Sequence, residues 1–236
     1  MGNLNNIFCQ LPNGIEPFDL RILPPKQGCK LFHGCRTHRL ANGTHFCHMT
    51  LKDGKWIGQC DYCSLFTALW RQQREQEAKQ IKPVERIYYN VIDRRNQDKG
   101  PLVFSMGKTL HTIIITAIAG QVNFLRQSGH IQKPLGDVTH YKTGRDFQVR
   151  RFMQHGPGGI QYPDYSQSGF LEPSKAGTKK EWDFWMASLH TLSTIPRMED
   201  AATVKSVIEQ HMGFDLDQPK VKKGRVYRSI DAEWEV

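Results

Sequence analysis

Metal-binding side chains gather between residues 38 and 63 of the chain. Cys60 and Cys63 form a Cys-x-x-Cys pair, in which a short turn can aim both sulfur atoms at one ion. His38 and Cys47 precede this pair, on either side of an Asn42-Gly43 dipeptide that favours a tight hairpin turn. A hairpin at that point would bring His38 and Cys47 together. These residues therefore predict one four-coordinate zinc site with three sulfur ligands and one nitrogen ligand.

The nitrogen ligand has alternatives, because other histidines are near in sequence: His33, His45 and His48. The remaining cysteines have no paired spacing, and we interpret them as ordinary buried or surface thiols: Cys9, Cys29 and Cys35. Four protein ligands leave no open position on zinc for a water molecule. The ion is therefore expected to be structural, and the protein is expected not to be an enzyme.

A second set of residues combines positive charge with aromatic rings. On one predicted strand Arg86 and Tyr88 share a face, with Tyr89 on the opposite, core face. On a later strand Arg150 and Phe152 share a face, and a glycine-rich loop follows that contains Tyr162 and Tyr165. Single-stranded nucleic acids bind to cations and to aromatic faces on which bases stack. The pattern predicts such a surface, with further basic residues along its groove: Arg94, Arg95, Lys108, Lys142 and Arg145.

The overall charge agrees with a polyanionic partner. The 236 residues include 32 Lys and Arg against 23 Asp and Glu, which gives a net charge of +9. The first residues lack the pattern of a signal peptide, and no apolar run approaches the ~20 residues of a membrane span. We therefore expect a cytoplasmic protein whose six cysteines are thiols or metal ligands.

Hydrophobic periodicity indicates a mixture of strands and helices. Strands are predicted at 18–22, 85–93, 101–105 and 146–153, and hairpins between 38 and 59, with a second turn at Asp53-Gly54. Helices are predicted at 65–80, 110–122, 182–192 and 201–212. The glycine-rich segment 155–170 is predicted to be a functional loop without regular structure. The chain is expected to comprise an N-terminal segment (1–14), a core (15–213) with a metal subdomain at about 33–80, and a flexible basic tail (214–236).

The order of these features resembles the single-stranded DNA-binding proteins of T-even phages, which are also called helix-destabilising proteins. The resemblance covers roughly residues 15–175. Besides the His, Cys and Cys-x-x-Cys spacing, it rests on several segments: Leu20–Pro24, Arg86–Asp93, Phe104–Lys108, Gly136–Thr139 and Gly159–Leu171. The zinc spacing is the most specific of these.

The resemblance implies an α+β fold, in which an OB-fold β-barrel carries an inserted zinc-ribbon subdomain and flanking helices. It implies one zinc ion on His38, Cys47, Cys60 and Cys63, and DNA contacts from Arg86, Tyr88, Phe152 and Tyr165. Such a protein coats and protects single-stranded DNA during phage replication, recombination and repair, in the cytoplasm of the bacterial host. Its implied partners are single-stranded DNA, further copies of itself and phage replication proteins. The family's basic N-terminal arm and long acidic C-terminal tail have no counterpart in residues 1–13 and 231–236.

Two other functions compete with this interpretation. Several histidines beside a Cys-x-x-Cys pair suggest a zinc-containing nuclease of the HNH type, but no compact His-Asn-His arrangement follows Cys63. A zinc-stabilised transcription or virion interaction module is the other alternative, and it would bind a protein partner through the helix that contains Trp182 and Trp185. The sequence does not distinguish DNA from RNA as the preferred ligand.

Overall fold

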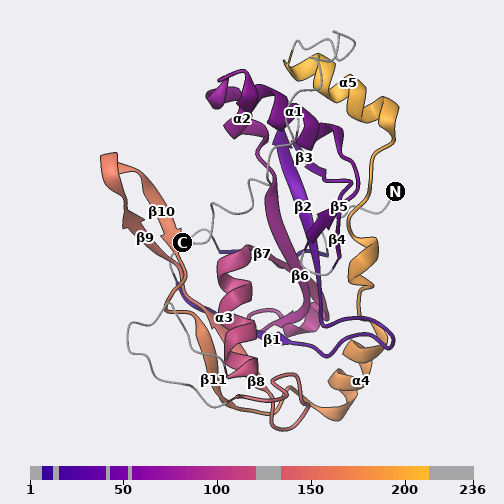
Figure 1. The fold of residues 1–236 in the computed structure, drawn as a ribbon. Coiled ribbons are helices and arrows are strands. Elements are labelled where there is room, and N and C mark those ends of the chain that lie inside the picture. Colours follow the sequence, from indigo (N-terminus) through magenta and orange to yellow (C-terminus); the bar gives the residue numbers. More distant parts are fainter. Residues whose placement is uncertain (1–6, 13–15, 41–42, 53–54, 121–133, 213–236) are drawn as a thin grey trace. The chain divides into compact units, whose positions relative to one another are not determined.

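The computed structural model describes residues 7–12, 16–40, 43–52, 55–120 and 134–212 (Figure 1). The chain divides into two compact units, Met1–Glu199 and Asp200–Val236, and each unit is considered by itself. Some positions that the sequence analysis uses lie outside the described residues: Asn42, the turn at Asp53-Gly54, Val122 and the basic tail 214–236.

An antiparallel sheet forms the centre of the first unit. Its strands follow the order β11, β8, β1, β6, β2, β3, and β7 pairs with β6 along the edge opposite β2. The strands are β1 (Phe18–Ile22), β2 (Phe32–Leu40), β3 (Gly43–Phe46), β6 (Val84–Asp93), β7 (Leu102–Met106), β8 (Arg145–Val149) and β11 (Gly169–Pro173). Because β6 is ten residues long, β2 can pair with its first part and β1 with its end. The strands predicted around β1, β6 and β7 are confirmed.

The sheet remains open in the part of the chain that the structure describes. At one end β11 pairs with β8 alone, and at the other end β3 pairs with β2 alone. The predicted α+β fold is confirmed as an antiparallel sheet with helices, whereas a closed barrel is not found among these residues.

Two short hairpins stand apart from the main sheet. One consists of β4 (Thr50–Lys52) and β5 (Lys55–Ile57), and the other of β9 (Phe152–His155) and β10 (Gln161–Asp164). The second hairpin corrects two expectations. The strand predicted at 146–153 is interrupted, because the Ser168 hydroxyl hydrogen-bonds to the Arg150 N–H and carbonyl group and so ends the pairing of β8. The predicted irregular loop contains β10, and its glycines form the turn that precedes it.

The helices are α1 (Asp61–Arg71), α2 (Glu75–Ile81), α3 (Lys108–Ala119), α4 (Lys179–Ala187) and, in the second unit, α5 (Ala201–Met212). A helix lies in each predicted segment, but the segment predicted at 65–80 contains two helices, which are separated at Gln73 (φ 60°), and α4 ends five residues before the predicted end at 192. The end of α3 is fixed by Gly120, whose left-handed backbone (φ 69°) would be strained for other residues. A Cβ atom at Gly120 would also lie 2.5 Å from Pro134. None of the described helices has the length and apolar character that a bilayer crossing requires.

The central strand β6 is covered on both of its faces. Tyr89 and Val91 point into the main core, where Leu110 and Ile114 of α3 also lie. On the opposite face, Tyr88 belongs to a buried cluster that includes residues from 192–195, and Ile92 belongs to another that includes residues from 176–189. Alternate side chains of β6 therefore enter different buried clusters, and in the buried part of the strand neither face is turned to the solvent.

A buried arginine joins β1 to β8 in the first unit. The Arg21 side chain has 0% exposure, and its Nε atom donates to Asp146 Oδ1 at 2.7 Å. Its Nη2 atom donates to the Ser174 hydroxyl oxygen at 2.6 Å. A second guanidinium, that of Arg94, donates from Nε to the same Asp146 oxygen at 3.0 Å. One carboxylate thus serves two arginines, and burial lowers the pKa of Arg21.

Candidate functional site

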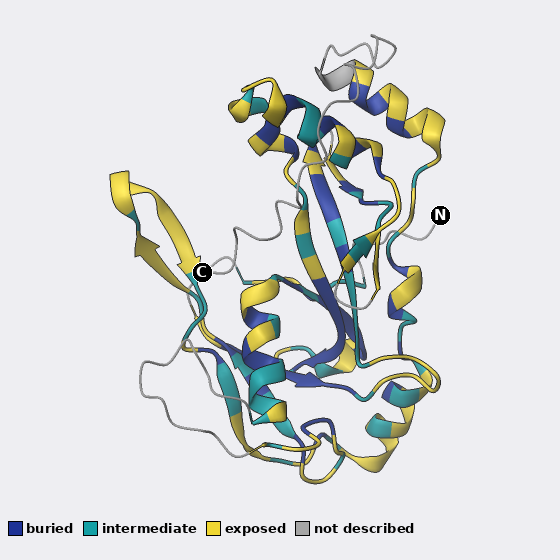
Figure 2. Cartoon of the chain, in the orientation of Figure 1, coloured by how far each residue is buried: buried dark blue, intermediate teal, exposed yellow. Residues whose placement is uncertain are grey.

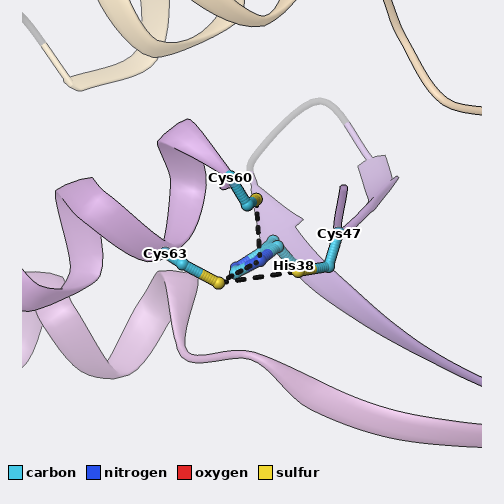
Figure 3. A group of neighbouring side chains, drawn as sticks. All are labelled: His38, Cys47, Cys60 and Cys63. Carbon is cyan, nitrogen blue, oxygen red and sulfur yellow. Dashed lines mark hydrogen bonds between the residues drawn. The ribbon is translucent and has the colours of Figure 1, made fainter. Parts of the chain in front are cut away.

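The four residues that the sequence predicts as metal ligands converge in the first unit. His38 lies in β2, Cys47 directly after β3, Cys60 at the N-cap of α1 and Cys63 in its first turn. Their ligand atoms all lie within 4.8 Å of one another, and Figure 3 shows the cysteine side chains pointing toward the His38 ring. All are buried except Cys63, which is partly buried. The cluster can hold one metal ion.

The ring of His38 is oriented by a hydrogen bond outside the cluster. Its Nδ1 atom donates to the carbonyl oxygen of Ile81 at 2.8 Å, which requires the proton to be on Nδ1. The Nε2 atom then faces the sulfur atoms, at 3.5 Å from Cys63 Sγ and 3.7 Å from Cys60 Sγ. Outer hydrogen bonds of this kind fix the tautomer and orientation of a metal-binding histidine.

An arriving metal ion must displace protons from this cluster. Burial lowers the pKa of His38, but hydrogen bonds with Cys47 and Cys60 outweigh that effect and raise this pKa to about 9. Hydrogen bonds with Cys47 lower the pKa of the Cys60 thiol and raise that of the Cys63 thiol, so His38 and Cys63 are the groups that hold protons. Metal binding therefore releases protons, and the apparent metal affinity is expected to fall as the pH is lowered.

A second layer of side chains supports the ligands. The Tyr62 ring, which lies between the two cysteines of α1, packs against the rings of His38 and His45 with centroid separations of 5.4 Å. Tyr62 donates its hydroxyl proton to Glu199 Oε2 at 2.9 Å, and His45 Nδ1 lies 2.8 Å from Glu199 Oε1. Glu199 thus ties α1 to β3. Sequence reasoning missed Glu199, because it lies 137 positions after Tyr62 and no local pattern marks it.

We expect Glu199→Gln to speed metal release without removing the metal. Glutamine keeps the size of the side chain but loses the charge that pairs with His45 and that accepts from Tyr62. Outer-layer changes at metal sites typically cost 10–100-fold in affinity, and because Glu199 acts through Tyr62 we expect roughly 10-fold. The rate of metal transfer to a chromogenic chelator measures the effect. Glu172→Gln, at a carboxylate whose side chain is 95% exposed, is the control, and equal rates in both variants would contradict the prediction.

The hairpin of β9 and β10 presents two of the predicted aromatic contacts. Phe152 is 36% exposed and Tyr162 is 45% exposed, and Figure 2 shows both strands as exposed. Gln154 lies directly opposite Tyr162, so Phe152, two residues earlier, shares the face of Tyr162. The Tyr162 hydroxyl donates to Gln154 Oε1 at 3.2 Å, which restrains the ring. Exposed Arg150, two residues before Phe152, adds a positive charge.

Tyr88 does not offer an exposed ring. It is 3% exposed, it belongs to a cluster with Cys35 and Leu192, and Phe8 contacts it edge to face at 6.0 Å between ring centroids. Burial raises the pKa of its hydroxyl group. The expected exposure of Tyr88 was wrong, because β6 is covered on both faces. Tyr165 is partly buried and packs against the main core.

The predicted cations fall into two groups. Arg94 is held by Asp146, and Arg95 donates to Asp93 at 2.6 Å and lowers the pKa of that carboxylate although burial raises it. Arg145 donates to a backbone carbonyl at 2.8 Å. These three arginines contribute to the fold. The side chains in the second group are exposed, and they come from separate places in the first unit: Arg86, Lys108, Lys142 and Arg150.

Comparison with known proteins places the chain in a family. Among curated proteins, none matches the chain. The family model described as "gp32 DNA binding protein like" matches residues 19–213. That range includes the sheet apart from the first residue of β1, both hairpins, the metal cluster and helices α1 to α5. Because the match covers most of the 236 residues, the chain belongs to the gp32-like family of DNA-binding proteins.

Proposed function

We propose that the protein binds single-stranded DNA and catalyses no reaction. Membership of a DNA-binding family carries the proposal. The preference for single strands is supported by Phe152 and Tyr162, whose exposed rings share one face of the hairpin. Bases of a single strand are free to stack on such rings, whereas bases of a duplex are already stacked on one another.

The metal in this proposal is zinc, and its role is structural. Zinc with Zn–S bonds of about 2.3 Å in a tetrahedron holds its sulfur ligands about 3.8 Å apart. The Cys47 and Cys63 sulfur atoms lie 3.5 Å apart, and the distances from His38 Nε2 to sulfur are similar, at 3.5 and 3.7 Å. Three thiolates and one imidazole form a donor set that suits zinc and fills its coordination.

The antiparallel sheet is proposed to be an OB-type sheet that carries the metal subdomain. OB folds are partly open barrels that bind oligonucleotides, so an open arrangement of these strands is compatible with the proposal. Family resemblance supports the wider role: coating and protecting single strands during phage replication, recombination and repair in the host cytoplasm. In that role the protein would act together with further copies of itself and with replication proteins.

Titration of oligo-dT across a range of salt concentrations tests the proposed function. Affinity should fall steeply with salt, with a slope of about 0.7 per phosphate that the protein neutralises. Phe152→Ala and Tyr162→Ala should each lose about 1–3 kcal/mol of binding free energy, because each removes a stacking ring. Parallel titrations with RNA and duplex DNA measure the preference for single-stranded DNA.

The matched control is Met153→Ala, which removes an exposed side chain from the opposite face of β9. Salt-independent binding, or equal losses in all three variants, would contradict the stacking surface. Incubation of DNA with magnesium or manganese tests the absence of catalysis. Reproducible cleavage that His48→Ala abolishes would replace the binding role with a nuclease.

A further inference from the structure

A pocket in the first unit gathers lysine side chains away from the hairpin. It has a volume of about 660 Å³ and is lined by Tyr141, Lys142, Lys175 and Lys179. The lining comes from two segments, the turn before β8, and the loop before α4 together with the first residue of α4. Lysine side chains from both segments therefore border one concave surface.

Two of these three ammonium groups have no carboxylate at ion-pair distance among the described residues. Lys179 pairs with Asp183, one turn further along α4. The Glu181 carboxylate accepts hydrogen bonds from the backbone N–H and the hydroxyl group of Thr178, the N-cap residue of α4, at 2.7 Å each. The charges of Lys142 and Lys175 therefore give the pocket an excess of positive charge. Like charges held close together repel one another, and a bound anion relieves that repulsion.

The aromatic ring of the pocket is already in contact with its neighbours. Tyr141 packs against Trp182 at 5.3 Å between ring centroids, and the Lys175 ammonium lies 5.5 Å from the Tyr141 centroid. The ring therefore supports the lysines and is not presented as a platform for a base. The excess positive charge at the pocket favours an anionic ligand, and phosphate groups are the anions of the proposed DNA ligand.

The pocket lies at the opposite end of β8 from the hairpin. Lys142 precedes Arg145, the first residue of β8, whereas Arg150 and β9 follow its last residue. Five strand residues span about 17 Å. At the duplex spacing of about 3.4 Å per nucleotide, which is the shortest spacing for a strand, that distance corresponds to at most about five nucleotides. That length is within the roughly 4–16 nucleotides that one OB fold binds.

We propose that the lysine pocket binds backbone phosphates of single-stranded DNA, at a contact separate from the hairpin where bases stack. The inference rests on the proposed function and extends it. Lys142 and Lys175 supply charge without base contact, so this contact strengthens binding equally for all sequences. It engages strands long enough to pass from the hairpin to the pocket, and shorter strands bind at the hairpin alone.

The double variant Lys142→Gln/Lys175→Gln tests the pocket through the salt dependence of binding. With an oligo-dT of about 16 nucleotides, loss of two phosphate contacts should reduce the salt slope by about 1.4. With an oligo-dT of about three nucleotides, which is too short to reach from the hairpin to the pocket, the slope of the double variant should match that of the parent protein. Lys26→Gln/Lys99→Gln removes the same charge at exposed sites outside the pocket and is the control. Thermal melting verifies that all variants are folded.

An unchanged salt slope of the double variant with the long strand would overturn the proposal. An equal reduction of the slope in the Lys26→Gln/Lys99→Gln control, or a reduction with the short strand, would do the same. Binding of a labelled oligoglutamate peptide tests whether the ligand of the pocket is an acidic protein segment. If that peptide binds the parent and not the double variant, while the DNA slope is unchanged, the pocket belongs to an acidic protein segment and the proposal is wrong. If the parent binds no single-stranded DNA, the proposed function itself fails, so the two failures are distinguishable.

Discussion

Cys60→Ser is expected to abolish metal binding and to unfold the structure around the metal cluster. The cluster joins β2, the end of β3 and α1, and the helices beside it enclose a small core that includes Leu65, Leu69 and Ile81. A core of this size gives limited stability on its own. Binding of structural zinc is worth about 10–16 kcal/mol of apparent folding free energy in small modules. Removal of one thiolate therefore has a larger effect than an ordinary core substitution.

Metal analysis and hydrogen exchange measure this effect. The variant should contain no bound metal, and the amides of α1 and α2 should lose their protection. Cys29→Ser is the matched control, because Cys29 is an exposed thiol outside the cluster. One equivalent of metal in Cys60→Ser, with protected helices, would refute the ligand set.

Asp146→Asn should destabilise the first unit by about 3–5 kcal/mol, because it removes the partner of a buried charge. Asparagine keeps the shape of the side chain and removes the negative charge that serves Arg21 and Arg94. Arginine cannot lose its proton to escape burial. Both guanidinium groups would then remain close together, and that of Arg21 is fully buried.

Urea denaturation measures the loss as a lower midpoint with an unchanged slope. For a domain of this size, the same loss lowers Tm by about 6–20 °C. The control is Asp183→Asn, which breaks an ion pair between exposed side chains on α4 and should cost about 0.5 kcal/mol or less. If Asp146→Asn melts like that control, the buried network contributes little to stability.

The metal cluster could be predicted from the sequence because its geometry is local. Cys60 and Cys63 are two residues apart at the start of a helix, and His38 and Cys47 are joined by a hairpin. Turn chemistry and ligand spacing fix such contacts over short stretches of chain. Glu199 lies in the same site, yet it arrives from a distant segment. No short-range pattern predicts that contact.

The exposure of side chains on β6 needed the tertiary structure. Alternation predicts which residues share a face, and it correctly placed Tyr89 in the core. It does not predict how many faces are covered. Phe8 and Leu192, from segments far apart in the chain, bury Tyr88 on the second face. A strand in the middle of a fold therefore gives the same alternating pattern as a strand with one solvated face.

The sequence by itself determined the residues that could hold a metal ion, the mixture of strands and helices, and the resemblance to phage DNA-binding proteins, because these follow from spacing, periodicity and composition. The tertiary structure decided where strands stop and which charges are free. The Ser168 hydroxyl ends β8 at Arg150 and leaves Phe152 on a separate hairpin. Asp146 engages Arg21 and Arg94, whereas Lys142 remains exposed at a pocket. These outcomes depend on contacts between distant segments, whose free energies are set by burial and charge in the folded chain.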